Sequence, residues 1–259
     1  MASARTSQRA LIGVTALLFV GSAVATIAWS TSMSAIGAMP MPGGWSMSMT
    51  WMRMSGQTWA GAAASFVAMW TVMMIAMMLP SLVPMLIRYR RSVGDSGEAR
   101  LAMLTAVVAV GYFTVWSALG VVVFPLGAAL AAAELRLPVL ARVVPVATGV
   151  VVMMAGALQL TRWKARHLEW DHDTRSHGCA MTADASTAWR HGLCLGVHCS
   201  YCCAGLTASF LALGAMDLRV MAVVTAAITL ERLAPVSMRA ARAVGVLGVI
   251  TGALLIARG

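Results

Sequence analysis

Seven apolar stretches, each about as long as a membrane-spanning helix, constrain this 259-residue chain more than any other feature. They cover residues 10–29, 59–87, 101–132, 143–160, 192–215, 220–234 and 243–257. The sixth is the weakest, because it is short and carries Glu231 and Arg232 near its end. Hydrophobic residues make up 60% of the chain and charged residues 11%, whereas soluble proteins average roughly 45–50% and about 25%. The sequence therefore predicts an all-α polytopic membrane protein, a bundle of about seven transmembrane helices, and excludes an ordinary soluble enzyme.

The basic residues predict the orientation of this bundle. With the N-terminus in the cytoplasm, 14 of the 19 Lys and Arg residues fall on the cytoplasmic side, as the positive-inside rule requires. The net charge of +10 is then a matter of topology, so we expect a lipid bilayer and no nucleic acid as partner. The first span has features of a signal peptide, but its apolar run continues to Trp29 and favours a retained helix. We expect a multi-pass protein of the bacterial plasma (inner) membrane.

The chain reads as one transmembrane domain, residues 1–259, with a Met-rich outer loop at 30–58 and a His- and acid-rich inner loop at 161–191. The outer loop contains Met33, Met39, Met41, Met47, Met49, Met52 and Met54. Thioether sulfur is a soft, uncharged ligand that suits Cu(I). Six of these methionines form pairs two residues apart that can close on one ion, and we interpret these six as a site of secondary metal capture: Met39, Met41, Met47, Met49, Met52 and Met54. The alternative is a surface loop whose Met and Trp side chains pack on lipid headgroups and neighbouring helices.

The second span contains two ridges of Met at helical spacing. Met69, Met73 and Met77 form one ridge, and Met74 and Met78 form the other. Packing is the ordinary explanation of such a stripe, but these ridges directly follow the outer loop and could continue a thioether path into the bilayer.

Two prolines in the same span should bend its helix. Pro80 and Pro84 each remove a backbone donor and free a carbonyl, and we expect Ser81 to bond one of those carbonyls.

The helix predicted at 192–215 opens with a cluster of Cys and His. The cluster consists of His191, Cys194, His198, Cys199, Cys202 and Cys203. Successive residues of a helix are rotated by about 100°, so all six project from one half of the helix. Four of them share an arc of about 80°: His191, Cys194, His198 and Cys202. Thiolates and imidazoles so placed are the expected ligands of Cu(I) or Zn(II). The alternatives are Cys as small buried hydrophobes and, less readily on a helix, a disulfide.

Two further sets of polar residues are weaker candidates. Glu231 could be a ligand, a proton carrier or a partner of Arg232. The inner loop could form a second metal site, although a solvated loop of mixed charge explains it nearly as well. Its candidate ligands are His167, Glu169, Asp171, His172, Asp173, His177 and Cys179.

The chain resembles the bacterial family of predicted metal-binding integral membrane proteins, a domain-of-unknown-function family. Three segments carry the resemblance: residues 70–81 with their Met-Met-x-Ala-Met-Met-x-Pro element, residues 158–164, and residues 191–235 with Cys199-x-x-Cys202-Cys203. The resemblance implies Cys199, Cys202 and Cys203 as metal ligands, with Met73, Met74, Met77 and Met78 as partners. This chain departs from the family at Tyr201, where Gly is expected, at His167, where Cys is expected, and at Asp217, where Asn is expected.

Together these features predict a protein that captures, delivers or transfers a soft metal, with Cu(I) as the first candidate and zinc as the second. A membrane metalloenzyme or a copper carrier protein is the expected protein partner. The sequence contains no P-loop and no Asp-Lys-Thr-Gly segment, which argues against active pumping. Two alternatives stay open: a metal-containing subunit of a membrane oxidase or oxygenase, and a structural subunit without metal.

Overall fold

Seven α-helices dominate the part of the chain that the computed structural model describes, namely residues 2–35, 37–54, 56–93, 97–162, 164, 184–233 and 237–258. The helices are α1 (Ala2–Ala35), α2 (Trp59–Val93), α3 (Glu98–Arg136), α4 (Pro138–Gln159), α6 (Ala185–Gly214), α7 (Leu218–Leu233) and α8 (Ser237–Arg258). Each predicted span lies within one of these helices, to within one residue at its C-terminal end. The prediction of an all-helical fold is confirmed.

Six of these helices are long and apolar enough to cross a membrane, and α7, with its 16 residues, is the exception. The weakness of the sixth predicted span is therefore real. Insertion into a membrane and the orientation of the bundle stay predictions.

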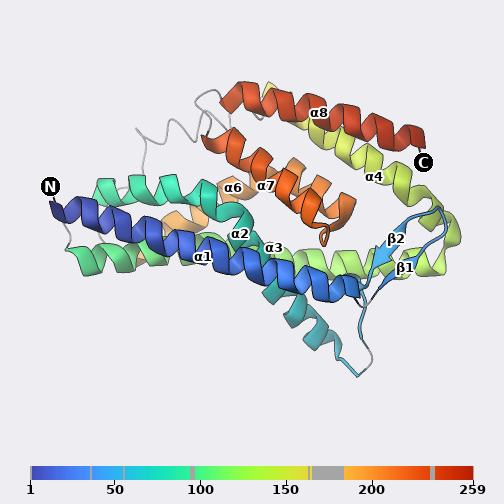
Figure 1. The fold of residues 1–259 in the computed structure, drawn as a ribbon, viewed down its shortest axis with the longest axis horizontal. Helices are drawn as coiled ribbons and strands as arrows, with labels where there is room; N and C mark the ends of the chain where they lie inside the picture. Colours follow the sequence, from blue (N-terminus) through green and yellow to red (C-terminus); the bar gives the residue numbers. More distant parts are fainter. Residues whose placement is uncertain are drawn as a thin grey trace.

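Successive helices run back and forth along the long axis of the molecule (Figure 1). The start of α1, the end of α2 and the start of α6 lie toward one end, which we call the N-terminal end. The end of α1, the start of α2 and the junction of α3 with α4 lie toward the other, which we call the hairpin end because a small β-hairpin lies there. This alternation is what the predicted topology requires.

The connection predicted at residues 133–142 is wrong as a loop. α3 continues to Arg136, α4 begins at Pro138, and Leu137 alone separates the two helices. Pro is well suited to the first position of a helix because its missing N–H has no intrahelical partner there. An apolar pattern locates the residues that can lie in the membrane interior. It does not locate the ends of a helix, because polar residues can continue the helix beyond the apolar stretch.

Glycines let the helices approach closely at two interfaces. α6 packs along α3 and α8 packs along α4. A Cβ added at Gly192 of α6 would lie 2.3 Å from the carbonyl oxygen of Val108 on α3. A Cβ at Gly156 of α4 would lie 2.6 Å from the backbone nitrogen of Val249 on α8. Small residues at such crossings are typical of helix pairs that pack through their backbones.

The helix α2 contains both Pro80 and Pro84 and bends along its length, as predicted (Figure 1). The role expected for Ser81 is wrong, because its buried hydroxyl has no hydrogen-bond partner among the described residues. The physical reason is register. A Ser hydroxyl in a helix reaches carbonyls three or four residues earlier, whereas Pro80 frees the carbonyl of Ala76, five residues before Ser81.

Candidate metal centre

The five ridge methionines of α2 are buried together in the main core. Met69, Met73, Met74, Met77 and Met78 are each at most 5% exposed. They belong to one connected cluster that also contains the side chains of Cys199 and Cys203 from α6. The structure thus brings the Met ridges and two of the candidate thiols into the same dry interior.

Cys199 and Cys203 form a pair one helical turn apart on α6. Their Sγ atoms lie 3.9 Å from each other, and both side chains are buried. The hydroxyl of Tyr112 on α3 donates a hydrogen bond of 2.8 Å to Sγ of Cys199. Tyr112 escaped the sequence analysis because a single Tyr in an apolar span carries no metal-binding pattern. Its hydroxyl fixes the position of the thiol that it contacts.

The other members of the predicted Cys/His cluster point elsewhere. Cys202 packs with Ala241 and Met238 of α8, away from the main core. Cys194 is exposed, the ring of His191 stacks on Tyr89 at 5.5 Å between centroids, and His198 is half-buried.

These six side chains have different surroundings because they are spread over half the circumference of α6, and the two edges of that half face different helices. In the part of the chain that is described, no three His, Cys, Asp or Glu side chains converge so that they could hold a metal ion. At the thiol pair the structure therefore brings together two sulfur donors, those of Cys199 and Cys203.

A buried polar cluster contacts α6 at the backbone of Cys202. Lys164 and Glu231 are 1% and 2% exposed, and their Nζ and Oε2 atoms are 2.7 Å apart. The Gln159 amide donates to Oε1 of Glu231 at 2.7 Å, and Lys164 Nζ donates to the backbone carbonyl of Cys202 at 2.7 Å. The sequence left Glu231 as a ligand, a proton carrier or a partner of Arg232, and the structure gives it an ion pair with Lys164, which was not among these roles. The sequence analysis missed Lys164 as a site residue because it placed this lysine in a polar loop.

A second cation also lies near the thiol pair. Arg232 follows Glu231 on α7. Its Nη1 lies 4.0 Å from Sδ of Met85 on α2. Two positive side chains from different segments thus lie close to this part of the core, and the charge of Lys164 is balanced by Glu231.

The methionines of the predicted outer loop divide into two groups. Met39 and Met47 face each other across the hairpin formed by β1 (Ala38–Pro40) and β2 (Ser46–Ser48). Met41 and Met47 are buried against Ala131 and Ala141 at the α3–α4 junction. These three therefore pack the hairpin against the bundle, as the packing alternative expects.

The hairpin is also fixed by a hydrogen bond, in which Trp45 Nε1 donates to the carbonyl of Ala141 at 2.8 Å. Met49, Met52 and Met54 follow the hairpin and line a cavity beside the start of α2. The candidate ligands of the inner loop, from His167 to Cys179, lie outside the described residues.

The fold and the buried sulfur atoms define a helical bundle with a core rich in thiol and thioether groups. The chain matches the copper chaperone family PpoB2 over residues 67–255, and it belongs to that family. The matched region begins within α2 and includes both the Met ridges and the Cys pair. No curated protein and no solved structure shows a significant match. The family supports a copper-related function, while the assignment to a domain-of-unknown-function family stays a prediction.

Proposed function

We propose that this protein is a membrane-bound copper chaperone that holds Cu(I) as cargo on the thiol pair of Cys199 and Cys203 and passes it to a copper-using partner protein. The observation that carries the proposal is the position of this pair. Two buried sulfur atoms 3.9 Å apart lie in the same core as five buried methionines, in a chain of a copper chaperone family. Thiolate and thioether ligands together favour Cu(I) over harder ions.

The charges around the pair support a monovalent soft ion. Binding of Cu(I) by two thiolates releases two protons, leaves the oxidation state of copper unchanged and gives the site one net negative charge. Arg232 of α7 is the cation that could balance that charge, because the charge of Lys164 is already paired with Glu231. Zinc fits less well, because structural zinc sites take four Cys, His or carboxylate ligands and no three such side chains converge in the described regions.

The six long apolar helices support placement in a membrane. A helix of 35 residues such as α2 is about 52 Å long, whereas the hydrocarbon core is about 30 Å thick. The helix would therefore extend beyond the hydrocarbon, and its hairpin end would reach the aqueous phase. A reporter fusion after residue 54 should report the periplasmic side of a bacterial inner membrane, and a cytoplasmic signal there would contradict the predicted orientation. A fusion at the C-terminus should report the periplasmic side if the short α7 also crosses, as the seven predicted spans require, and the cytoplasmic side if only the six long helices cross.

The test of the function is copper content. We would purify the full chain anaerobically in detergent with reductant, load it with Cu(I) and quantify copper and zinc per chain. The informative variant is Cys199→Ser/Cys203→Ser, and Cys194→Ser is the matched control because it removes an exposed thiol from the same helix.

We expect one copper per chain or more in the wild type and in the control. The double variant should contain about one copper per chain less, because it lacks the thiol pair. Retention of all copper in the double variant would refute the thiol pair as the site. No copper in the wild type after loading would refute the function and favour a structural subunit.

A further inference from the structure

The hairpin end contains two neighbouring cavities lined with methionine. The larger has a volume of about 180 Å³ and lies between the end of α1, the segment after the hairpin and the start of α2. Its lining includes Met33, Met49, Met52, Met54 and Met69. We call it the vestibule.

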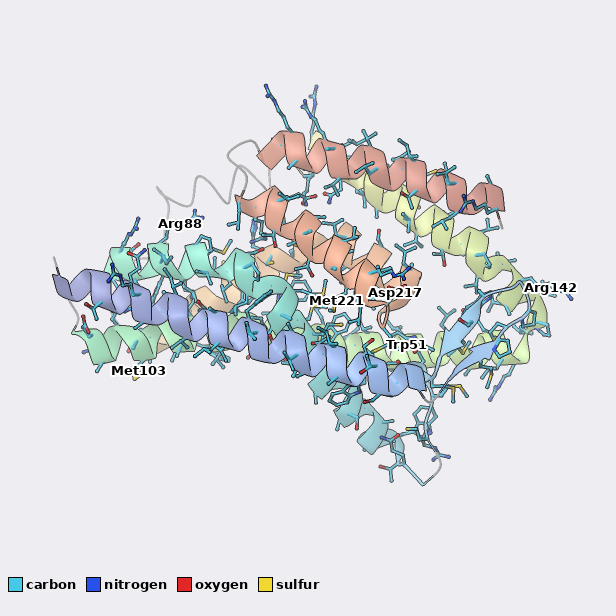
Figure 2. The ribbon with its side chains drawn as sticks, in the orientation of Figure 1. Trp51, Arg88, Met103, Arg142, Asp217 and Met221 are labelled. Atoms are coloured by element: carbon cyan, nitrogen blue, oxygen red, sulfur yellow. The ribbon has the colours of Figure 1, made fainter. Side chains whose placement is uncertain are left out.

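The smaller cavity has a volume of about 10 Å³, which is room for about one water-sized body. Its lining includes Met69, Met73, Met216 and Met221, with residues from α1 and from the α6–α7 turn. Figure 2 shows Met221 and Asp217 at the start of α7, in the region where these segments meet. We call it the inner cavity.

Met69 lines both cavities. Met73, which lines the inner cavity, lies one helical turn further along α2 and belongs to the core cluster that contains Cys199 and Cys203. Met69 and Met73 thus connect the lining of the vestibule with the core. Met216 of the α6–α7 turn and Met221 of α7 line the inner cavity with them, which nothing in their sequence spacing indicates, because only the folded chain brings these segments to α2.

The position of the inner cavity is fixed by a long-range contact. The hydroxyl of Ser30 on α1 donates a hydrogen bond of 2.7 Å to the backbone carbonyl of Met216. Asp217, at the edge of the cavity, uses one carboxylate oxygen to accept from the backbone nitrogens of Arg219 and Val220. That carboxylate therefore caps α7, and the methionine side chains supply the soft ligands.

The ligand chemistry of the vestibule is selective. None of its described lining residues is His, Cys, Asp or Glu, and its polar side chains are Thr50, Gln57 and Ser65. The nearest guanidinium in this segment, that of Arg53, lies over the ring of Trp59 at 5.7 Å and is not among the lining residues. An uncharged thioether lining offers a soft monovalent ion several ligands and offers Zn(II) none of those it prefers.

We infer that the vestibule is the uptake site for Cu(I) and that Met69 passes the ion to the inner cavity, from which it reaches the thiol pair. This inference rests on the proposed function and adds the site of uptake to it. At each step one thioether–Cu(I) bond forms as another breaks, with no change in oxidation state and no proton released. Only arrival at the two thiols releases protons.

The test separates the vestibule from the thiol pair. In the Cys199→Ser/Cys203→Ser background, Cu(I) binding is measured by competition with a chromogenic Cu(I) chelator, with excess Zn(II) present. We expect residual Cu(I) binding that Zn(II) does not displace. Adding Met69→Leu or Met52→Leu should weaken that binding by at least about tenfold, the lower end of the cost of losing even an outer-shell partner at a metal site. Leu for Met conserves volume, so the fold should be retained.

The matched control is Met47→Leu, because Met47 belongs to the same Met-rich segment but is buried in the hairpin core and lines neither cavity. Binding should be unchanged in this control. Equal weakening by Met47→Leu would overturn the inference and make the whole loop a nonspecific capture surface.

A kinetic readout uses the chain with its thiols intact. Cu(I) bound at the pair protects Cys199 and Cys203 from alkylation, so the rate at which protection appears reports arrival of the ion. Met69→Leu should slow this rate and leave the final extent of protection at Cys199 and Cys203 unchanged. An unchanged rate would refute the vestibule route while the proposed function stands. If the wild type is never protected, the proposed function itself fails.

Discussion

Breaking the buried ion pair between Lys164 and Glu231 should be far more costly than removing both of its members. The two side chains are almost fully buried, and their charged atoms are 2.7 Å apart. Removing one partner leaves the other charge buried without compensation, which costs about 3–5 kcal/mol. We therefore expect Lys164→Met and Glu231→Gln each to lower the free energy of unfolding by about that amount.

The double variant should recover most of this loss. If the two sites were independent, the double variant would lose about 6–10 kcal/mol. With both charges absent, no buried charge is left unpaired, and the amide introduced at position 231 still accepts from Gln159. The carbonyl of Cys202 lies inside α6, where an intrahelical donor remains. We expect the double variant to lie within about 2 kcal/mol of the wild type, since swaps of similar volume usually cost less than about 1.5 kcal/mol.

The measurement is a double-mutant cycle on the protein in mixed micelles, unfolded by increasing amounts of sodium dodecyl sulfate and followed by circular dichroism. Asp217→Asn serves as the control for loss of a carboxylate, because Asp217 is exposed and Asn caps a helix as well as Asp does. Additive losses in the double variant would refute the reasoning, since they would mean that the two charges stabilise the fold independently of each other.

Three further outcomes are expected. Tyr112→Phe removes the hydrogen bond to Cys199 and should lower the free energy of unfolding by about 1 kcal/mol, measured by the same unfolding assay. Gly192→Ala should destabilise the protein by about 1–3 kcal/mol because the new methyl group meets a backbone carbonyl of α3, whereas Gly205→Ala, which has ordinary contact distances, should not. Hydrogen bonds from the Ser hydroxyl and backbone amides that follow it hold the pKa of Asp184 below its ordinary value. The ionised carboxylate should therefore cap α6 fully above the ordinary pKa of Asp, and the cap should be lost as the pH falls through the lowered pKa of Asp184. The loss is measured as faster amide hydrogen exchange in the first turn of α6.

The helices were predictable because their signal is local. An apolar stretch of about 20 residues in a chain of this composition has few alternatives to a helix, and each predicted span lies within an observed helix. The bend of α2 was predictable for the same reason, because Pro80 and Pro84 act on their own helix. The error at the α3–α4 junction arose because hydropathy marks a membrane interior rather than the ends of helices.

The candidate site was predictable in residue type but only partly in arrangement. The sequence indicated that Cys199 and Cys203 lie one turn apart, and the structure places them together. It also grouped Cys194 and Cys202 with them, and these point to other surroundings. When candidate ligands are spread over half of a helix, their spacing does not tell which of them face the same neighbouring helix.

The sequence by itself thus determined the class of fold, the positions of the helices and the abundance of soft ligands. Only the tertiary structure decided which of those ligands meet. It paired Lys164 with Glu231, brought Met221 of α7 to Met69 of α2, and turned Met47 into hairpin packing. The physical reason is that hydropathy and spacing are properties of one segment, whereas the direction in which a helix faces is set by packing against segments far away in the chain.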